Sequence, residues 1–190
     1  TRSPIILPMS TTARHIRLRA LTLEDAFVTW QWRNQDEIRN DFSGHPFPVN
    51  YEQEKEWYLK ILGSNIPTTA FGIEIVSSSQ LAGMTFLKNI NQLHRQAEFA
   101  ILVDKAQSGK GYGKEACMQT LQFAFSNLGL HRIFLKVRKD NTAAIKVYTA
   151  CGFTEEGVLR EDVYKQGEFK DVLIMSILSY EFQILDRGKL

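Results

Sequence analysis

Ser108-Gly-Lys-Gly-Tyr-Gly113 is the stretch of this 190-residue chain that decides its fold. The segment before it, 99–103, is apolar, and the segment after it carries apolar residues at helical spacing as far as Leu128. A glycine loop between a strand and a helix presents backbone N–H groups and the positive end of the helix dipole to an anion. Because glycine lets the backbone approach a ligand closely, three glycines in five residues favour a phosphate-binding loop over a plain connection.

Two familiar phosphate-binding motifs match the loop poorly. A kinase-type P-loop needs glycine where Ser108 stands and a hydroxyl side chain where Glu115 stands. The segment from Gly111 to Ala116 matches a dinucleotide-binding fingerprint, but that motif also needs an acidic residue about 20 positions on. The stretch 117–139 contains no Asp or Glu. The loop alone therefore leaves its phosphate ligand open.

A second motif follows about 30 residues later, where 141–153 reads Asn-Thr-Ala-Ala-Ile-Lys-Val-Tyr-Thr-Ala-Cys-Gly-Phe. Together, the loop and this segment resemble the GCN5-related N-acetyltransferase (GNAT) family. In that family the glycine loop holds the diphosphate of coenzyme A, and Asn-x-x-Ala-x-x-x-Tyr-x-x-x-Gly-Phe lines the other side of the cofactor. The resemblance extends over about residues 14–180. The chain departs from it at Ser108, where Gln or Arg is usual, and Gln107 stands one place upstream.

The resemblance implies an α/β (α+β) fold, the GNAT fold, with a mixed central sheet of about seven strands and helices on both faces. Residues 9–190 are interpreted as a single domain, and residues 1–8, which precede Met9, as vector-derived; a natural extension is the alternative. The patterns of apolar residues and capping residues agree with this fold. They predict strands at 16–20, 70–76, 81–90, 95–103, 131–137, 153–164 and 170–178, and helices at 22–33, 50–61, 112–128 and 141–150.

Composition restricts the function classes. Hydrophobic residues at 44% and a net charge of +2 are ordinary for a globular protein and give no reason to expect a nucleic-acid partner. No apolar stretch is long enough to span a bilayer, so no membrane partner is expected. Cys117 and Cys151 are predicted to be buried free thiols, which fits a cytoplasmic protein. The four histidines are scattered, so no metal site is predicted.

The resemblance also implies where acetyl-CoA, the co-substrate of the family, binds to the chain. The backbone of the apolar strand is expected to run beside the pantetheine amides, as an added strand would. Asn141 is expected either to form a hydrogen bond with the pantetheine arm or to cap the helix that it begins. The cofactor-binding residues are predicted to be Ile101, Leu102, Val103, Ser108, Gly109, Lys110, Gly111, Tyr112, Gly113, Lys114, Asn141 and Ala144.

Acetyl transfer to an amine needs a neutral amine and a proton for the leaving thiolate. An alkylamine with a pKa of about 10.4 is mostly protonated at pH 7, a deficit worth about 4–5 kcal/mol. Tyr148 stands at the family position that faces the sulfur and is the predicted general acid; an aromatic residue packing its helix onto the sheet is the alternative. Glu98 is the predicted general base; a structural carboxylate paired with Arg95 or His94 is the alternative.

The acceptor is predicted to be a small molecule with a primary amine. Segment 91–99 resembles spermidine/spermine N-acetyltransferases within the family, and segment 32–39 resembles acetyltransferases of amino-sugar nucleotides. An N-terminal acetyltransferase of a ribosomal protein and a non-catalytic acyl-CoA sensor are the alternatives. A homodimer is an expectation from the family. Four aromatic residues fall where the family builds its acceptor pocket, with Trp30 expected in the core: Trp30, Trp32, Phe42 and Phe47. Nearby Asp36, Glu37 and Asp41 would attract a cationic amine or form a solvated acidic face.

Overall fold

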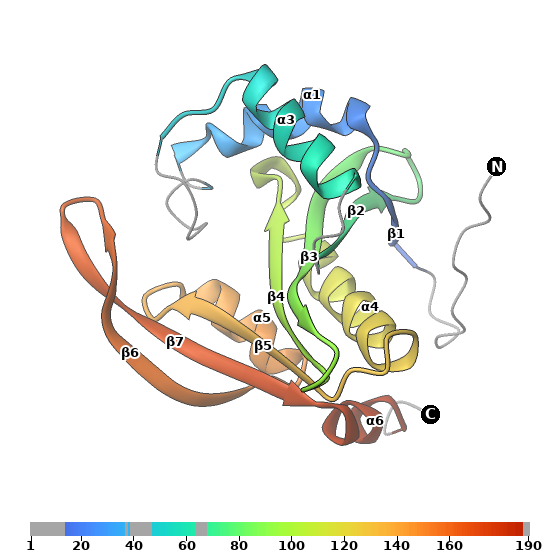
Figure 1. Ribbon diagram of the computed structural model, residues 1–190, viewed down its shortest axis with the longest axis vertical. Helices are drawn as coiled ribbons and strands as arrows, with labels where there is room; N and C mark the ends of the chain where they lie inside the picture. Colours follow the sequence, from blue (N-terminus) through green and yellow to red (C-terminus); the bar gives the residue numbers. More distant parts are fainter. Residues whose placement is uncertain (1–13, 37, 39–46, 64–67, 188–190) are drawn as a thin grey trace.

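The computed structural model describes residues 14–36, 38, 47–63 and 68–187 (Figure 1). Seven strands form one mixed sheet in the order β1-β2-β3-β4-β5-β7-β6, which confirms the predicted sheet. Only β4 and β5 run parallel among the described pairs; the other neighbours are antiparallel. The strands are Ile16–Ala20 (β1), Thr69–Ile75 (β2), Leu81–Asn91 (β3), Gln96–Val103 (β4), Arg132–Arg138 (β5), Thr154–Lys165 (β6) and Glu168–Leu178 (β7).

Helices cover both faces of the sheet, as predicted. Helices α4 (Tyr112–Ser126) and α5 (Thr142–Ala150) pack on one face, and α1 (Ala26–Arg33) and α3 (Tyr51–Leu62) pack on the other (Figure 1). Two short 3-10 turns, Leu23–Asp25 (η1) and Lys105–Gln107 (η2), precede α1 and α4. A last helix, α6 (Ser179–Arg187), follows β7 and was not predicted.

Local signals in the sequence explain where several helices begin and end. The Asn50 side chain accepts a hydrogen bond from the N–H of Gln53, and the Gln53 side chain accepts one from the N–H of Asn50, both at 2.9 Å. This reciprocal pair satisfies two N–H groups at the start of α3. Gly152 follows α5 with φ of +95°, the left-handed conformation that ends many helices. The observed bounds agree with the helices predicted at 50–61 and 141–150.

Alternation along β4 divides the core between the two faces. Ala97 and Phe99 are buried in the cluster formed with α4 and α5, whereas Leu102 is buried in the cluster formed with α1 and α3. Side chains of successive strand residues point to opposite faces, so β4 is covered on both sides. This explains the continuous apolar run before the glycine loop.

A fork opens between the two parallel strands. The register of β4 with β5 covers only three residue pairs, from Gln96↔Arg132 to Glu98↔Phe134. The register of β4 with β3 continues to Val103. Beyond Glu98, β4 therefore has no strand neighbour on its β5 side among the described residues, and the two strands diverge (Figure 1). The backbone of 99–103 presents an open strand edge to the fork.

Some expectations concern residues that are not described. The proposed vector-derived segment 1–8 lies outside the described residues, so the division into 1–8 and a single domain at 9–190 stays a prediction. Most of the expected loop over 41–49 also lies outside them.

Candidate active site

The glycine loop leads directly into the first turn of α4. Gly109 and Gly111 adopt left-handed φ angles of +78° and +82°. The N–H of Glu115 donates to the carbonyl of Gly111 at 3.1 Å, so the N–H groups of residues 112–114 have no intrahelical acceptor. A Cβ atom built on Gly109 or Gly111 would meet no atom within 4 Å. The loop therefore has an open side that faces away from the protein and fits an anion such as a diphosphate.

Side chains around the loop add positive charge. Lys110 Nζ donates to Gln107 Oε1 at 2.8 Å, and Gln107 itself is buried. The amide oxygen of Gln107 is thus directed back to a lysine of the loop. Ser108 and Lys114 are exposed. The loop combines backbone donors with two nearby ammonium groups, which suits a diphosphate.

The predicted pantetheine strand lies along the fork. Ile101 and Val103 pack against the apolar cluster that includes Ala116 of α4, whereas Leu102 points to the opposite face and is buried against α1 and α3. The N–H of Asp104 donates to the carbonyl of Ala82 in β3. By the alternation of antiparallel pairing, the backbone groups of Leu102 therefore also face β3, and those of Ile101 and Val103 face the fork. Leu102 was predicted to bind the cofactor, and the structure directs both its side chain and its backbone groups away from this edge. An extended ligand with amide groups would find unpaired backbone groups here, in the manner of an added strand.

At the start of α5, Asn141 caps the helix. Its side-chain oxygen accepts a hydrogen bond from the N–H of Ala144 at 3.1 Å. The capping alternative is thus confirmed, and a bond from Asn141 to the pantetheine arm stays a prediction. Ala144 packs against the core beneath the helix.

Tyr148 is held at the fork by two aromatic rings. Its ring centroid lies 6.2 Å from that of Phe99 and 5.8 Å from that of Phe153, with edge-on geometry in both contacts. Burial, and then the nearby thiols of Cys117 and Cys151, raise the pKa of Tyr148 above its ordinary value. Among the described residues, none forms a hydrogen bond with its hydroxyl. The phenol is a protonated donor at neutral pH. It lies next to Phe99, the first residue of β4 that has no pairing partner in β5.

Glu98 stands at the apex of the fork, as the last residue of β4 that pairs with β5. Lys88 Nζ lies 3.1 Å from Glu98 Oε1, and Asn89 Nδ2 donates to Glu98 Oε2 at 3.2 Å. Arg95 was an expected partner of this carboxylate, but it donates to the carbonyl of Gly129 at 2.7 Å instead. His94 is likewise not its partner: its backbone N–H donates to the Asn91 side chain. Glu98 is ion-paired as the structural alternative predicts, with a different cation.

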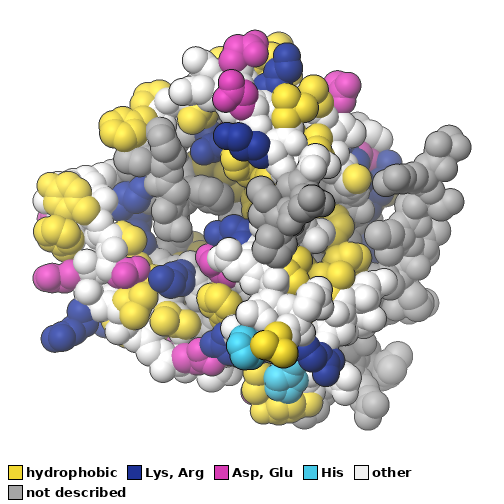
Figure 2. Space-filling model, viewed as in Figure 1, with side chains coloured by type: hydrophobic (Ala, Val, Ile, Leu, Met, Phe, Trp, Pro, Cys, Tyr) yellow, Lys and Arg dark blue, Asp and Glu magenta, His cyan; other side chains and the backbone are white. Residues whose placement is uncertain are grey.

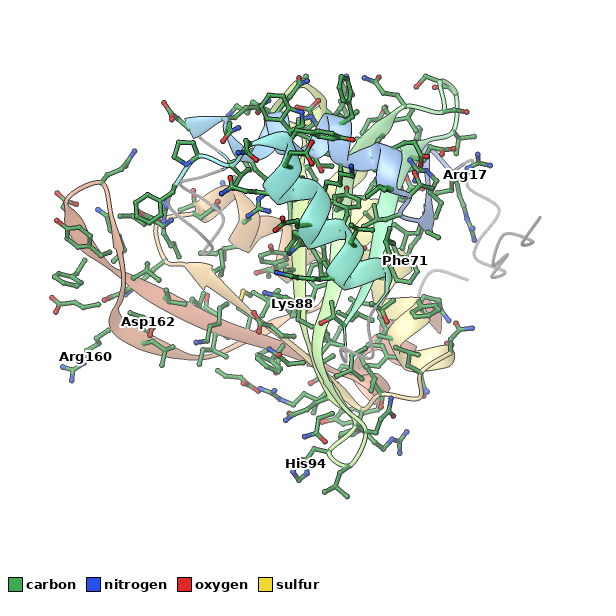
Figure 3. The ribbon with its side chains drawn as sticks, turned by 45° about the horizontal axis from the view of Figure 1, so that its top comes forward. Arg17, Phe71, Lys88, His94, Arg160 and Asp162 are labelled. Atoms are coloured by element: carbon green, nitrogen blue, oxygen red, sulfur yellow. The ribbon has the colours of Figure 1, made fainter. Side chains whose placement is uncertain are left out.

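Acidic and basic side chains alternate on the face of the sheet that carries Glu98. Arg132 pairs with Glu156, and Lys136 Nζ lies 3.9 Å from Asp162 Oδ2. A hydrogen bond from Ser176, followed by the contact with Arg132, lowers the pKa of Glu156. Figure 2 looks onto this face and shows a hollow with basic and acidic side chains around it. Lys88 belongs to β3 beside α3, whereas Asp162 belongs to the β6–β7 hairpin (Figure 3).

The expectation for the acceptor-side aromatic residues needs a correction. Helix α1 buries Ala26, Thr29 and Trp32, which are three residues apart and share one face. Trp32 is thus the core residue, and Trp30, which was expected in the core, is only half-buried. Phe47 is 66% exposed, and its part in an acceptor pocket stays a prediction. Phe42, Glu37 and Asp41 lie outside the described residues, and Asp36 is exposed.

Three further observations concern the described part of the chain. There, no three His, Cys, Asp or Glu side chains gather so that they could hold a metal ion. No helix among the same residues is both long and apolar enough to cross a membrane. Cys117 and Cys151 are free and buried, as predicted.

Comparison with known proteins identifies the family. The acetyltransferase (GNAT) domain matches residues 15–154. The chain therefore belongs to the GNAT family of acetyltransferases: it is an acyltransferase, and acetyl-CoA is its co-substrate. The fold and the fork described above are consistent with this assignment.

Several relatives have named activities. The chain is 32% identical over 167 residues to a spermidine N(1)-acetyltransferase of Vibrio cholerae, covering 88% of this chain and 95% of the relative. A crystal structure of spermidine N-acetyltransferase from Vibrio cholerae in complex with CoA and spermine superimposes with a TM-score of 0.83 at 31% identity, covering 89% of this chain and 98% of that one. A putative ribosomal N-acetyltransferase of Bacillus subtilis is 32% identical over 114 residues, 59% of this chain and 62% of the relative.

Proposed function

We propose that this acetyltransferase transfers an acetyl group to a primary amine of a polyamine, within a ternary complex and without a covalent enzyme intermediate. The observation that carries the proposal is the fork between β4 and β5. Glu98 is the last residue of β4 that pairs with β5, and its side chain points to one face of the sheet. The next residue, Phe99, points to the other face, where Tyr148 contacts it. An amine and a thioester that meet in the fork would thus have a carboxylate and a phenol on either side. Spermidine and spermine are the proposed acceptors because relatives with these names align over most of the chain.

The residues at the fork suit acetyl-CoA, which when bound supplies the thioester. The N–H groups at the start of α4 and the lysines of the loop would hold the diphosphate. The open edge of β4 at 101–103 would hold the pantetheine arm in an extended conformation. Holding both substrates in one geometry could contribute roughly 7–11 kcal/mol to lowering the barrier. Positioning by the backbone is therefore the main catalytic contribution that we assign to the chain.

Tyr148 is the proposed general acid. Its hydroxyl is protonated at neutral pH because even the ordinary tyrosine pKa of about 10 lies well above 7, and burial raises the pKa of Tyr148 further. A phenol can pass its proton to a leaving thiolate, whose conjugate acid has a pKa of about 8.5, and recover it from solvent afterwards. The edge-on contacts with Phe99 and Phe153 fix the ring, so the hydroxyl keeps one direction. Replacing Tyr148 with phenylalanine keeps these ring contacts and removes the proton, so this variant separates proton transfer from packing.

Glu98 is the proposed general base. An ammonium group that enters the fork would meet its carboxylate, which attracts the cation and can accept a proton directly or through water. Lys88 already pairs with this carboxylate at 3.1 Å, so the entering amine competes with a lysine. Because the deficit of neutral amine is worth about 4–5 kcal/mol, a base at this point supports turnover at neutral pH.

A second candidate acceptor is the N-terminal amine of a protein. The face of the sheet that carries Glu98 is where the acceptor would bind, and its charge is balanced by three ion pairs: Lys88–Glu98, Arg132–Glu156 and Lys136–Asp162. A balanced face suits a peptide, which carries both charges, better than a polycation. The resemblance to a putative ribosomal N-acetyltransferase supports the same reading over part of the chain.

We also propose that the protein is a cytoplasmic homodimer. Strand β6 is the outer strand of the sheet and carries exposed Val158, and the hairpin it forms with β7 exposes Tyr164 and Phe169. An outer strand with exposed apolar side chains is a natural place for a second copy to pair. The buried free thiols suit a reducing compartment. Sedimentation equilibrium tests the dimer, and a monomer at micromolar concentration would contradict it.

An amine panel tests the acceptor. The purified chain is incubated with acetyl-CoA and one amine at a time, and release of the CoA thiol is followed by colorimetry. The panel contains spermidine, spermine, an amino sugar nucleotide and peptides with free N-termini. The proposal predicts the highest kcat/KM for a polyamine, and a preference for peptides would support the second candidate. Binding of acetyl-CoA without turnover on any amine would favour a sensor over an enzyme.

A further inference from the structure

Two consecutive residues of β3 contact the same carboxylate. Lys88 Nζ lies 3.1 Å from Glu98 Oε1, and Asn89 Nδ2 lies 3.2 Å from Glu98 Oε2. Side chains of successive residues in a regular strand point to opposite faces of the sheet, so a regular β3 could offer only one of them to Glu98. The shared contact therefore requires a local change in the strand.

A β-bulge supplies that change. Lys88 pairs with Glu98 and Asn91 pairs with Gln96, so that Asn89 and Ile90 stand opposite a single residue of β4. Asn89 has a φ of +53°, in the left-handed region that few residues other than glycine adopt and that asparagine tolerates best. Bulges occur often beside active sites, where they redirect a side chain. Here the bulge turns the Asn89 amide toward the face that carries Glu98.

We propose that Asn89 is a positioning residue for Glu98: the bulge directs its amide onto one carboxylate oxygen while Lys88 holds the other. This inference rests on the proposed function, because it assumes that Glu98 receives the acceptor amine. With both oxygens engaged, the carboxylate keeps one plane, and its remaining lone pairs have fixed directions at the apex of the fork. An entering ammonium group would therefore meet an acceptor that is already oriented. Nothing in the resemblance or the sequence motifs assigns a role to Asn89.

The kinetic test is a double-mutant cycle. Asn89→Gly keeps the left-handed backbone and removes the amide, and Glu98→Ala removes the group to be positioned. The cofactor is acetyl-CoA and the acceptor is the best amine of the panel. Asn89→Gly is expected to lower kcat/KM for the amine about tenfold, the size of one hydrogen bond to a charged group, with KM for acetyl-CoA unchanged. In the Glu98→Ala background, Asn89→Gly should change kcat/KM for the amine less than about twofold.

A matched control separates positioning from backbone effects. Ser79 lies at the turn between β2 and β3 and has a φ of +57°. Ser79→Gly removes a small polar side chain from the same backbone conformation, away from Glu98, and should leave the kinetic constants at their wild-type values. An equal loss in Ser79→Gly and Asn89→Gly would overturn the inference.

A spectroscopic readout tests the contact without catalysis. The side-chain amide of Asn89 is the ¹H–¹⁵N signal pair that disappears in Asn89→Gly. Its shift should move in Glu98→Ala, because the carboxylate acceptor is gone; an unmoved signal would overturn the inference. The kinetic outcomes separate the two proposals. Reduced activity in Glu98→Ala with unchanged activity in Asn89→Gly overturns the role of Asn89 alone, and so does an equal loss from Asn89→Gly in both backgrounds. Full activity in Glu98→Ala overturns the base assignment and the positioning role together.

Discussion

The rings of Phe99 and Tyr148 meet edge-on, with their centroids 6.2 Å apart, at the point where β4 and β5 separate. Phe99 follows Glu98 in β4, so the two side chains point to opposite faces of the sheet. Tyr148 of α5 contacts Phe99 on one face, and the Glu98 carboxylate lies on the other face. The proposed acid and the proposed base thus both lie where the backbone hydrogen bonds between β4 and β5 end. The following predictions test this arrangement.

Replacing Tyr148 with phenylalanine removes the proton donor and keeps the ring contacts. We expect kcat to fall at least about 100-fold, the usual contribution of a general acid, while affinity for acetyl-CoA stays within about twofold. Steady-state kinetics and calorimetry measure the two quantities. Tyr180→Phe is the control, because this exposed tyrosine lies in α6 and its replacement should change neither kcat nor the affinity for acetyl-CoA. An unchanged kcat in Tyr148→Phe would remove Tyr148 from the acid role and leave it a packing residue.

Replacing Lys88 with methionine frees the Glu98 carboxylate from its competing cation. If Glu98 receives the amine, KM for a polyamine should fall several-fold, because the entering ammonium no longer displaces a lysine. The value of kcat should fall as well, because the carboxylate loses one of the two contacts that orient it. The matched control is Lys170→Met, which breaks the exposed pair with Glu168 near the β6–β7 turn and should leave KM for the polyamine unchanged. A KM that is the same in Lys88→Met and wild type would show that the acceptor binds elsewhere.

Gly111 tests the anion-binding loop. Its φ of +82° makes any other residue strained, by about 1–2 kcal/mol, and a side chain would extend into the open side of the loop. We expect Gly111→Val to weaken acetyl-CoA binding at least tenfold and to lower the melting temperature by a few degrees. Gly167→Val is the control for strain alone, since Gly167 has a φ of +85° at the β6–β7 turn and is equally free of neighbours. Equal acetyl-CoA affinity in both variants would argue against the loop as the diphosphate site.

Alkaline pH should destabilise the fold through Cys117. Burial, with a contribution from Cys151, raises the pKa of Cys117 well above its ordinary value, so the folded state retains a proton that the unfolded state releases. The unfolded state then binds fewer protons, and the free energy of unfolding falls as pH rises above about 8.5. The slope approaches about 1.4 kcal/mol per pH unit for one group.

Urea unfolding at a series of pH values measures this slope. The Cys117→Ala variant should unfold with a shallower slope than wild type between about pH 9 and 10, although removing a buried side chain makes it less stable at pH 7. Tyr148 is a separate source, because the pKa of Tyr148 is also raised and its contribution begins only above about pH 10. Parallel slopes in wild type and Cys117→Ala would contradict the prediction.

Much of the fold was predictable because its signals are local. Alternating or continuous apolar runs marked all seven strands, and Asn50 marked the start of α3, where the structure adds the reciprocal bond with Gln53. Helix α6 was missed, although a local signal was present. The Glu181 side chain accepts a hydrogen bond from the N–H of Leu178 at 2.8 Å, and Phe182 of this helix is buried. A helix of nine residues has few turns over which apolar spacing can be recognised.

The site was predictable where it is made of backbone and not where it depends on strand pairing. The glycine loop and the Tyr148 motif each occupy a continuous segment, so the resemblance to the family could place them residue by residue, and their roles stay predictions. The Lys88–Glu98 pair depends on the register of β3 against β4, and the Asn89 contact depends on a bulge within that register. Neither follows from residue types in a row. Trp32 was underestimated for a similar reason, since α1 turns that face inward and leaves Trp30 half-buried.

The most direct test of the central claim is a crystal structure of the protein bound to coenzyme A. We predict the diphosphate on the N–H groups between Gly109 and Lys114, the pantetheine arm along the β4 edge at 101–103, and the sulfur within hydrogen-bonding distance of the Tyr148 hydroxyl. A nucleotide bound outside the fork, or a Tyr148 hydroxyl directed away from the sulfur, would contradict the account.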